Sequence, residues 1–110
     1  MKNLLVAAAM AVAMIQAAPA ATYTYMCRDH HKLYPATLDT GKDDSCDGAT
    51  TSCTLIWRGS KFQNVKQGEG CCAEYLATDN GVSVDLCTAT QGVADLTIDK
   101  TTFKCQMPRH

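Results

Sequence analysis

Seven cysteines constrain the fold of this chain more than any other feature of its 110-residue sequence, and all of them follow an apolar N-terminal segment. They are Cys27, Cys46, Cys53, Cys71, Cys72, Cys87 and Cys105. Cysteines this dense in a short chain are typical of proteins that fold in an oxidising compartment and are stabilised by disulfides. The sequence therefore predicts a small disulfide-rich domain that functions outside the cytosol.

The first twenty residues are typical of a secretory signal peptide. Lys2 supplies the positive charge, and Leu4 to Ile15 is an apolar run shorter than the roughly 20 residues that a bilayer-spanning helix takes. Small residues in Ala18-Pro19-Ala20 predict cleavage after Ala20, and a membrane anchor is the alternative. We expect a signal peptide at 1–20 and one secreted, extracellular domain at 21–110.

The charge of the processed domain argues against several partners. Without Lys2, nine basic side chains stand against eleven acidic ones, a formal charge of −2. Nucleic-acid binding calls for a strongly basic surface, so no nucleic acid is expected as partner. No second apolar stretch of spanning length follows the signal segment, and no cofactor motif is present. A ninety-residue domain has a marginal core, to which each disulfide typically adds about 2–4 kcal/mol.

Alternating segments and turn signals predict a β-dominated fold. A strand is expected at Ala21 to Cys27, a short strand at Leu33 to Leu38, and a surface loop at Thr40 to Ser52. A loose tail is expected at Met107 to His110. The fold is expected to consist of hairpins with at most one or two short helices, and a compact α+β domain is the alternative.

Two hairpins follow from turn chemistry and cross-strand pairing. A turn at Arg58-Gly59 sets Leu55 opposite Phe62, which is a favourable apolar pair. A turn near Asp99-Lys100 sets Leu96 opposite Phe103 and Asp95 opposite Lys104.

A third hairpin is signalled by Asn80-Gly81, one of the strongest short turn signals. With a four-residue loop from Thr78 to Gly81, Ala77 faces Val82 and Cys72 faces Cys87. The same register sets Glu74 opposite Asp85, which is unfavourable because like charges repel. A helix from Cys71 to Ala77 is the alternative.

An odd number of cysteines leaves one thiol free or paired between chains. The hairpin register predicts Cys72–Cys87, and proximity of the chain ends predicts Cys27–Cys105. Of the remaining three, a free Cys46 would lie in a polar loop, whereas a free Cys71 could lie on an apolar face. We therefore favour Cys46–Cys53, with Cys71 as a free and buried thiol.

Few residues suggest a metal-binding, catalytic or partner-binding role. Asp29-His30-His31 lacks the further ligands and spacing that a zinc site needs, so no metal is expected. His30 or His31 acting with Glu69 or Glu74 as acid and base would give a small ribonuclease. Trp57 and Arg58 lie at a predicted tight turn, and these residue types are enriched at binding hot spots. They form the candidate binding tip; a Trp57 that folds back onto the core is the alternative.

The chain as a whole resembles the small cysteine-rich secreted proteins of filamentous fungi, the candidate-effector class. The resemblance rests on the signal ending Ala-Ala-Pro-Ala20, the mature length and the cysteine content. Tyr25-Met26-Cys27 also matches a Tyr-x-Cys pattern of some of those families, which implies Cys105 as the partner of Cys27.

The resemblance implies a virulence-related protein that binds a host or competitor component, either a protein or a cell-surface structure, without catalysis. An antimicrobial or killer-toxin-like protein is the second hypothesis, and a small secreted ribonuclease is the third. A membrane-active toxin would usually be basic, and a ribonuclease would cleave RNA. We expect a monomer, with a disulfide-linked dimer through the odd cysteine as the alternative.

Overall fold

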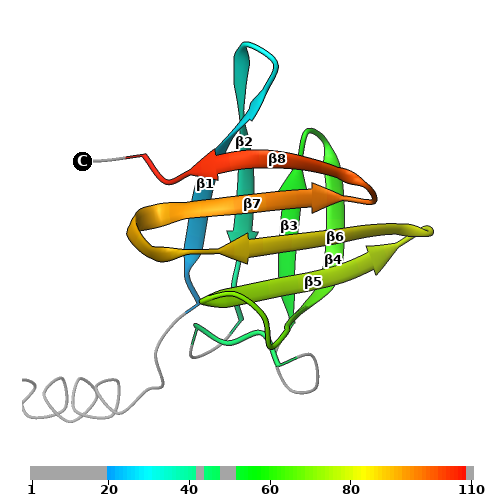
Figure 1. The fold of residues 1–110 in the computed structure, drawn as a ribbon. Coiled ribbons are helices and arrows are strands. Elements are labelled where there is room, and N and C mark those ends of the chain that lie inside the picture. The colour runs from blue at the N-terminus through cyan, green and yellow to red at the C-terminus, as the bar shows by residue number, and fades with distance from the viewer. Residues whose placement is uncertain (1–19, 42–43, 48–51, 109–110) are drawn as a thin grey trace, which may run out of the picture.

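The protein folds into a closed barrel of eight antiparallel strands that follow one another in chain order (Figure 1). The computed structural model describes residues 20–41, 44–47 and 52–108, so the predicted signal peptide and part of the predicted 40–52 loop lie outside the described residues. The strands are β1 (Thr22–Asp29), β2 (Lys32–Asp39), β3 (Cys53–Trp57), β4 (Ser60–Gln67), β5 (Ala73–Asp79), β6 (Val82–Thr88), β7 (Val93–Ile98) and β8 (Thr101–Gln106). The β-dominated expectation is confirmed, and the closed barrel is more specific than the hairpins that the sequence predicted.

Helix contributes almost nothing to the described part of the chain. The 3-10 turn η2 (Thr90–Gly92) connects β6 to β7. The alternative helix from Cys71 to Ala77 is wrong, because β5 occupies most of that segment. Within residues 20–41, 44–47 and 52–108, no helix has the length and hydropathy to cross a membrane.

Two-residue turns close four of the hairpins, β1–β2, β3–β4, β5–β6 and β7–β8. Arg58-Gly59 and Asn80-Gly81 both place two consecutive residues at positive φ, the conformation of the hairpin turns that match strand twist. Leu55 pairs with Phe62, as predicted. The expected pairs Leu96↔Phe103 and Asp95↔Lys104 are also present.

The predicted register of the Asn80-Gly81 hairpin is wrong by two residues. Asp79 pairs directly with Val82, so the loop has two residues instead of four. The shorter loop extends the ladder toward the turn, and Asn-Gly supports the positive φ that this turn requires. A shift of two residues preserves the faces of both strands. It does, however, place Glu74 opposite Cys87, where the prediction had placed Cys72.

This shift explains the disulfide that differs from expectation. The structure contains the expected Cys27–Cys105 and Cys46–Cys53 disulfides, but the third joins Cys71 to Cys87. The predicted Cys72–Cys87 bridge and the free, buried Cys71 are therefore wrong, and the exposed Cys72 is the free thiol of the described chain. The connection between β4 and β5 determines which of the two neighbouring cysteines reaches Cys87.

That connection folds back toward β5. The backbone N–H of Gly70 donates to Oε1 of Glu74 at 3.1 Å, and the N–H of Gly68 donates to the carbonyl of Glu74 at 2.8 Å. A Cβ on Gly68 would lie 2.7 Å from the same Oε1, so the connection approaches Glu74 more closely than a side chain would allow. The returning connection brings Cys71 to Cys87, with their Cα atoms 5.7 Å apart.

The interior of the barrel is filled by side chains. The largest fully buried aliphatic residues are Leu38, Leu55, Leu86, Leu96, Val65 and Val84. Trp57 and Phe62 join this core. Eight strands enclose a space that side chains can fill, which leaves the outer surface as the place to look for a functional site.

Candidate functional site

Exposed apolar side chains indicate the candidate site. Three large apolar residues are exposed in the described structure: Leu33 at 50%, Val93 at 43% and Ile56 at 37%. Leu33 and Val93 line the same surface groove, whereas Ile56 lies elsewhere, on β3. Exposed apolar residues that gather in one place are more informative than scattered ones.

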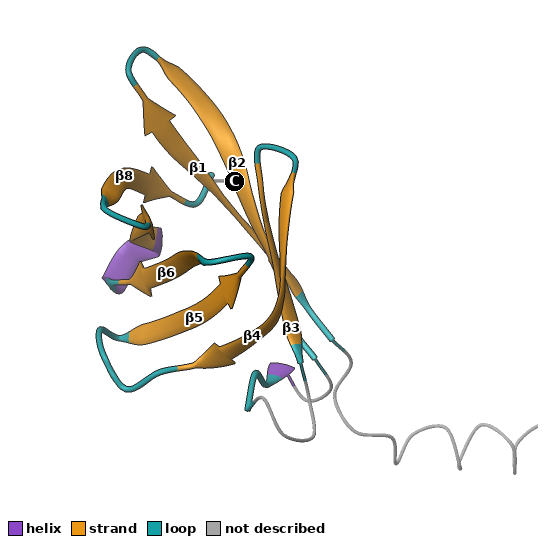
Figure 2. Cartoon of the chain, turned by 90° about the vertical axis from the view of Figure 1, so that its right-hand side faces the viewer, coloured by secondary structure: helices purple, strands orange, loops and turns teal. Residues whose placement is uncertain are grey.

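The groove lies on the outside of the barrel where β8 closes onto β1, and its volume is about 610 Å³. Its lining comes from β1, β2, β7, β8 and the segment after β8. The lining residues are Met26, Arg28, Leu33, Val93, Lys104, Cys105, Gln106, Met107 and Pro108. The β1–β2 hairpin, which carries Leu33, extends beyond the neighbouring strands (Figure 2).

Strand alternation places these side chains on the outer face. Cys27 and Cys105 are buried, so their chain neighbours Met26, Arg28 and Lys104 point outward. Two rows of outward side chains result. Register partners Val93, Gln106, Met26 and Pro35 form the first row, and Asp95, Lys104, Arg28 and Leu33 form the second.

The segment after β8 is fixed against the barrel and forms one side of the groove. The N–H of Met107 donates to the carbonyl of Gly92 at 2.8 Å. A Cβ on Gly92 would lie 3.1 Å from the Cβ of Met107, so the absence of a side chain there permits this close approach. The predicted loose tail is thus held in place at its first residue.

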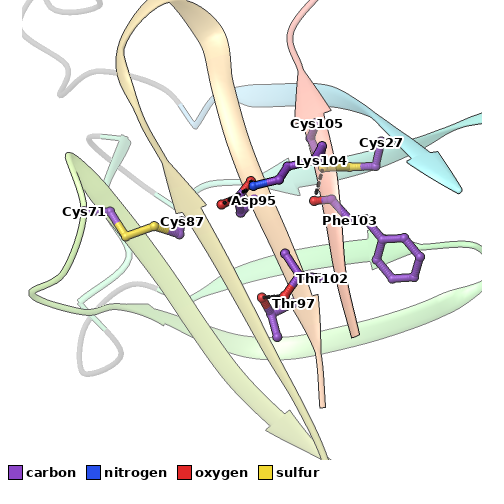
Figure 3. A network of polar contacts seen from close by, with 9 residues as sticks. All are labelled: Cys27, Cys71, Cys87, Asp95, Thr97, Thr102, Phe103, Lys104 and Cys105. Atoms are coloured by element: carbon purple, nitrogen blue, oxygen red, sulfur yellow. Dashed lines mark hydrogen bonds and ion pairs between the residues drawn. A yellow bond between two sulfur atoms is a disulfide. The ribbon is translucent and has the colours of Figure 1, made fainter. Parts of the chain in front are cut away.

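The closure of the barrel fixes the other side. Cys27 and Cys105 face each other in the ladder between β1 and β8, and their disulfide joins the two strands (Figure 3). Beside this disulfide, the ammonium of Lys104 lies 3.1 Å from Oδ1 of Asp95. Arg28 is opposite Lys104 and is exposed, with no ion pair among the described residues. The groove therefore carries a local excess of positive charge.

The predicted binding tip at Trp57 and Arg58 is not an exposed pair. Trp57 is only 6% exposed, and its ring centroid lies 6.2 Å from that of Tyr34 and 5.1 Å from that of Phe103. The interpretation of Trp57 as an exposed tip residue is wrong, and the alternative, a Trp57 that folds back onto the core, is confirmed, because Trp57 shares the inward face of β3 with Leu55. Arg58 stacks over Tyr34 at 3.9 Å and pairs with Asp29.

The residues of the ribonuclease hypothesis come from separate elements. His30 and His31 form the β1–β2 turn, whereas Glu69 lies in the β4–β5 connection and Glu74 in β5. Glu74 accepts its hydrogen bond from Gly70. The side chain of His30 is 91% exposed and lies 3.7 Å from Asp29. Among the described residues, no three His, Cys, Asp or Glu side chains gather in a way that could hold a metal ion.

A half-buried carboxyl, that of Asp85, lies on β6, outside the groove. Oδ1 of Asp85 is buried and has no hydrogen-bond partner in the described structure. Burial and the neighbouring carboxyl of Glu74 raise the pKa of Asp85 to about 6. This pair affects stability and is distant in the ladder from the groove, since β7 separates β6 from β8.

The groove could not be predicted from the sequence because its residues come from four strands. A signal was nevertheless present: Leu33 and Val93 are apolar at positions that alternate with inward-facing residues. The chain shows no significant match to any protein-family model, curated protein or solved structure.

Proposed function

We propose that this protein is secreted after cleavage at Ala20 and acts outside the producing cell as a non-catalytic, effector-type binding protein. The observation that carries the proposal is the groove at the barrel closure, where Leu33 and Val93 remain exposed. Three disulfides are consistent with an extracellular location. The partner is a host or competitor component, and the protein acts on it as a monomer.

The groove has the features of a recognition surface. Its walls are fixed by the Cys27–Cys105 disulfide and by the Met107–Gly92 hydrogen bond, so a partner would meet a preformed shape. Apolar side chains lie beside charged ones, as in the core and rim of a protein interface. Binding would cover apolar area that the isolated protein leaves in water.

A pull-down tests this function with a matched control. The oxidised mature protein, immobilised through its N-terminus, is incubated with host and competitor extracts beside two variants. Leu33→Ser/Val93→Ser removes both exposed groove residues, and Ile56→Ser removes the exposed apolar residue outside the groove. We expect wild type and Ile56→Ser to retain the same component, and the double variant to lose it.

Two results would contradict the proposal. Retention of the component by the Leu33→Ser/Val93→Ser variant would exclude the groove as the binding surface. Cleavage of RNA by the purified protein, lost in a His30→Ala/His31→Ala variant, would favour the ribonuclease function instead.

A further inference from the structure

The charges in the groove indicate what kind of segment would fill it. Arg28 and Lys104 are direct register partners across the β1–β8 seam, and like charges in this relation destabilise a sheet. The unfavourable pair lies beside the disulfide that closes the barrel, where the two strands cannot move apart. An anion placed between the two side chains would turn this repulsion into two attractions.

The described protein supplies only part of that negative charge. Asp95 approaches Lys104 from β7, on the side away from β1. Asp29 follows Arg28 in sequence, but its Oδ2 pairs with Nη1 of Arg58. The other register partner of Arg28 is Leu33, which carries no charge. Arg28 is therefore a cation whose nearby carboxylates are already engaged.

Apolar residues lie beside Arg28 in its own outward row and in the adjacent row. Leu33 lies next to Arg28 in the outward row, and Val93 and Met26 lie in the adjacent row. Leu33 and Val93 are about half exposed, so the groove is shallow and would leave a lipid chain largely in water. A segment supported by its own folded protein does not need such enclosure.

We propose that the groove binds an extended acidic segment of a partner protein, with a carboxylate between Arg28 and Lys104 and apolar side chains against Leu33 and Val93. The inference rests on the proposed function and names the chemistry of its partner. A long polyanion is disfavoured because the whole chain carries a formal charge of −1, so the positive charge is local. A segment with one or two carboxylates between apolar residues matches both the cations and the exposed apolar side chains of the groove.

Synthetic peptides test this directly in the oxidised protein, observed by NMR. The probe is a blocked Leu-Asp-Leu-Glu-Leu peptide, compared with Leu-Asn-Leu-Gln-Leu, which lacks charge, and Ser-Asp-Ser-Glu-Ser, which lacks apolar groups. We expect the first peptide to shift the amide signals of Arg28, Leu33, Val93 and Met107. The two controls should each bind more weakly by about fivefold or more.

Variants locate the carboxylate. Arg28→Gln should weaken binding of the acidic peptide by about fivefold or more, and raising the salt concentration should have a similar effect. Lys100→Gln is the matched control, because Lys100 lies in the turn at the other end of β8. It should leave the affinity within about twofold.

Two outcomes would overturn the inference, and a third would separate it from the proposed function. Equal binding of the neutral and acidic peptides would reject the carboxylate while leaving an apolar binding groove intact. Absence of groove shifts, with a component still retained in the pull-down, would reject the peptide chemistry and keep the proposed function. Groove shifts with no component retained would support the chemistry and contradict the proposed function.

The Arg28→Gln variant also distinguishes two other possible occupants of the groove from an acidic partner segment. Self-association in the ultracentrifuge that Arg28→Gln abolishes would identify a second copy of the chain. A shift in the NMR signals of the C-terminal residue in the Arg28→Gln variant, with no binding of the acidic peptide, would identify the chain's own C-terminal carboxylate as the occupant of the groove. Either result would overturn the inference.

Discussion

The two shortest strand pairings of the barrel are joined in different ways. β8 and β1 share three register pairs, and β4 and β5 share two, whereas every other neighbouring pair shares at least four. β4 and β5 are consecutive, so residues 68–72 join them directly. β8 and β1 belong to opposite ends of the chain, and Cys27–Cys105 joins them. At the β8–β1 pairing, the disulfide thus supplies the covalent connection that residues 68–72 supply between β4 and β5.

The largest expected effect comes from opening the closure. In the chain-entropy account, a disulfide with a sequence separation of 78 contributes about 4–5 kcal/mol, against about 2–3 kcal/mol for a separation of 7. Cys27→Ala/Cys105→Ala should therefore cost more stability than Cys46→Ala/Cys53→Ala in urea unfolding. Equal losses would show that the closure seam holds without its disulfide.

Removal of Trp57 should cost nearly as much. Its ring packs against Tyr34 of β2 and Phe103 of β8, so Trp57→Ala leaves a cavity that affects strands on both sides of the closure. Large-to-small core substitutions of this kind cost about 3–5 kcal/mol. Ile56→Ala, at the exposed neighbour, should stay within about 0.5 kcal/mol. A near-neutral Trp57→Ala in thermal melts would contradict the buried position.

The pH dependence of stability tests the raised pKa of Asp85, which lies on β6 beside β5. The pKa of Asp85 is raised from 3.8 to about 6 in the folded state, so the folded protein binds this proton more tightly than the unfolded chain does. The Asp85 contribution to stability should therefore fall as the pH rises from about 4 to about 6, and level off above. Asp85→Asn should raise the melting temperature at pH 7 and remove this dependence. An unchanged pH profile would contradict the raised pKa.

The smallest effect concerns the free thiol beside the β4–β5 connection. Cys72 is exposed and takes part in none of the three disulfides, so Cys72→Ser should leave the melting temperature almost unchanged. Any disulfide-linked dimer on a non-reducing gel should disappear in this variant. A dimer that persists would mean that another cysteine exchanges between chains.

Local sequence signals predicted the parts of the fold that depend on local geometry. The turns Arg58-Gly59 and Asp99-Lys100 gave correct registers because the flanking residues allow few pairings. The Thr78 to Gly81 stretch accepts a loop of two or four residues, and the structure has the two-residue loop, in which Asn80 and Gly81 both adopt positive φ. The sequence left two interpretations of Trp57 open, an exposed tip and a side chain folded onto the core, and its alternation with the buried Leu55 agrees with the second.

The barrel closure and the groove could not be predicted in this way. Closure depends on the twist and register accumulated over eight strands, which no single hairpin reveals. The opposition of Arg28 and Lys104 arises only when β8 meets β1. Sequence predicted the disulfide at that meeting point, Cys27–Cys105, but not the neighbours on its outer face.

The same disulfide determines how the molecule bears mechanical load. A pulling force applied to the two ends of the described chain passes from residues 20–27 through the Cys27–Cys105 bond to the residues that follow Cys105. Residues 28–104 lie in parallel with that covalent path and carry almost no tension while the bond is intact. Stretching the oxidised protein should therefore release only the short terminal segments, whereas the reduced protein would extend through the entire barrel.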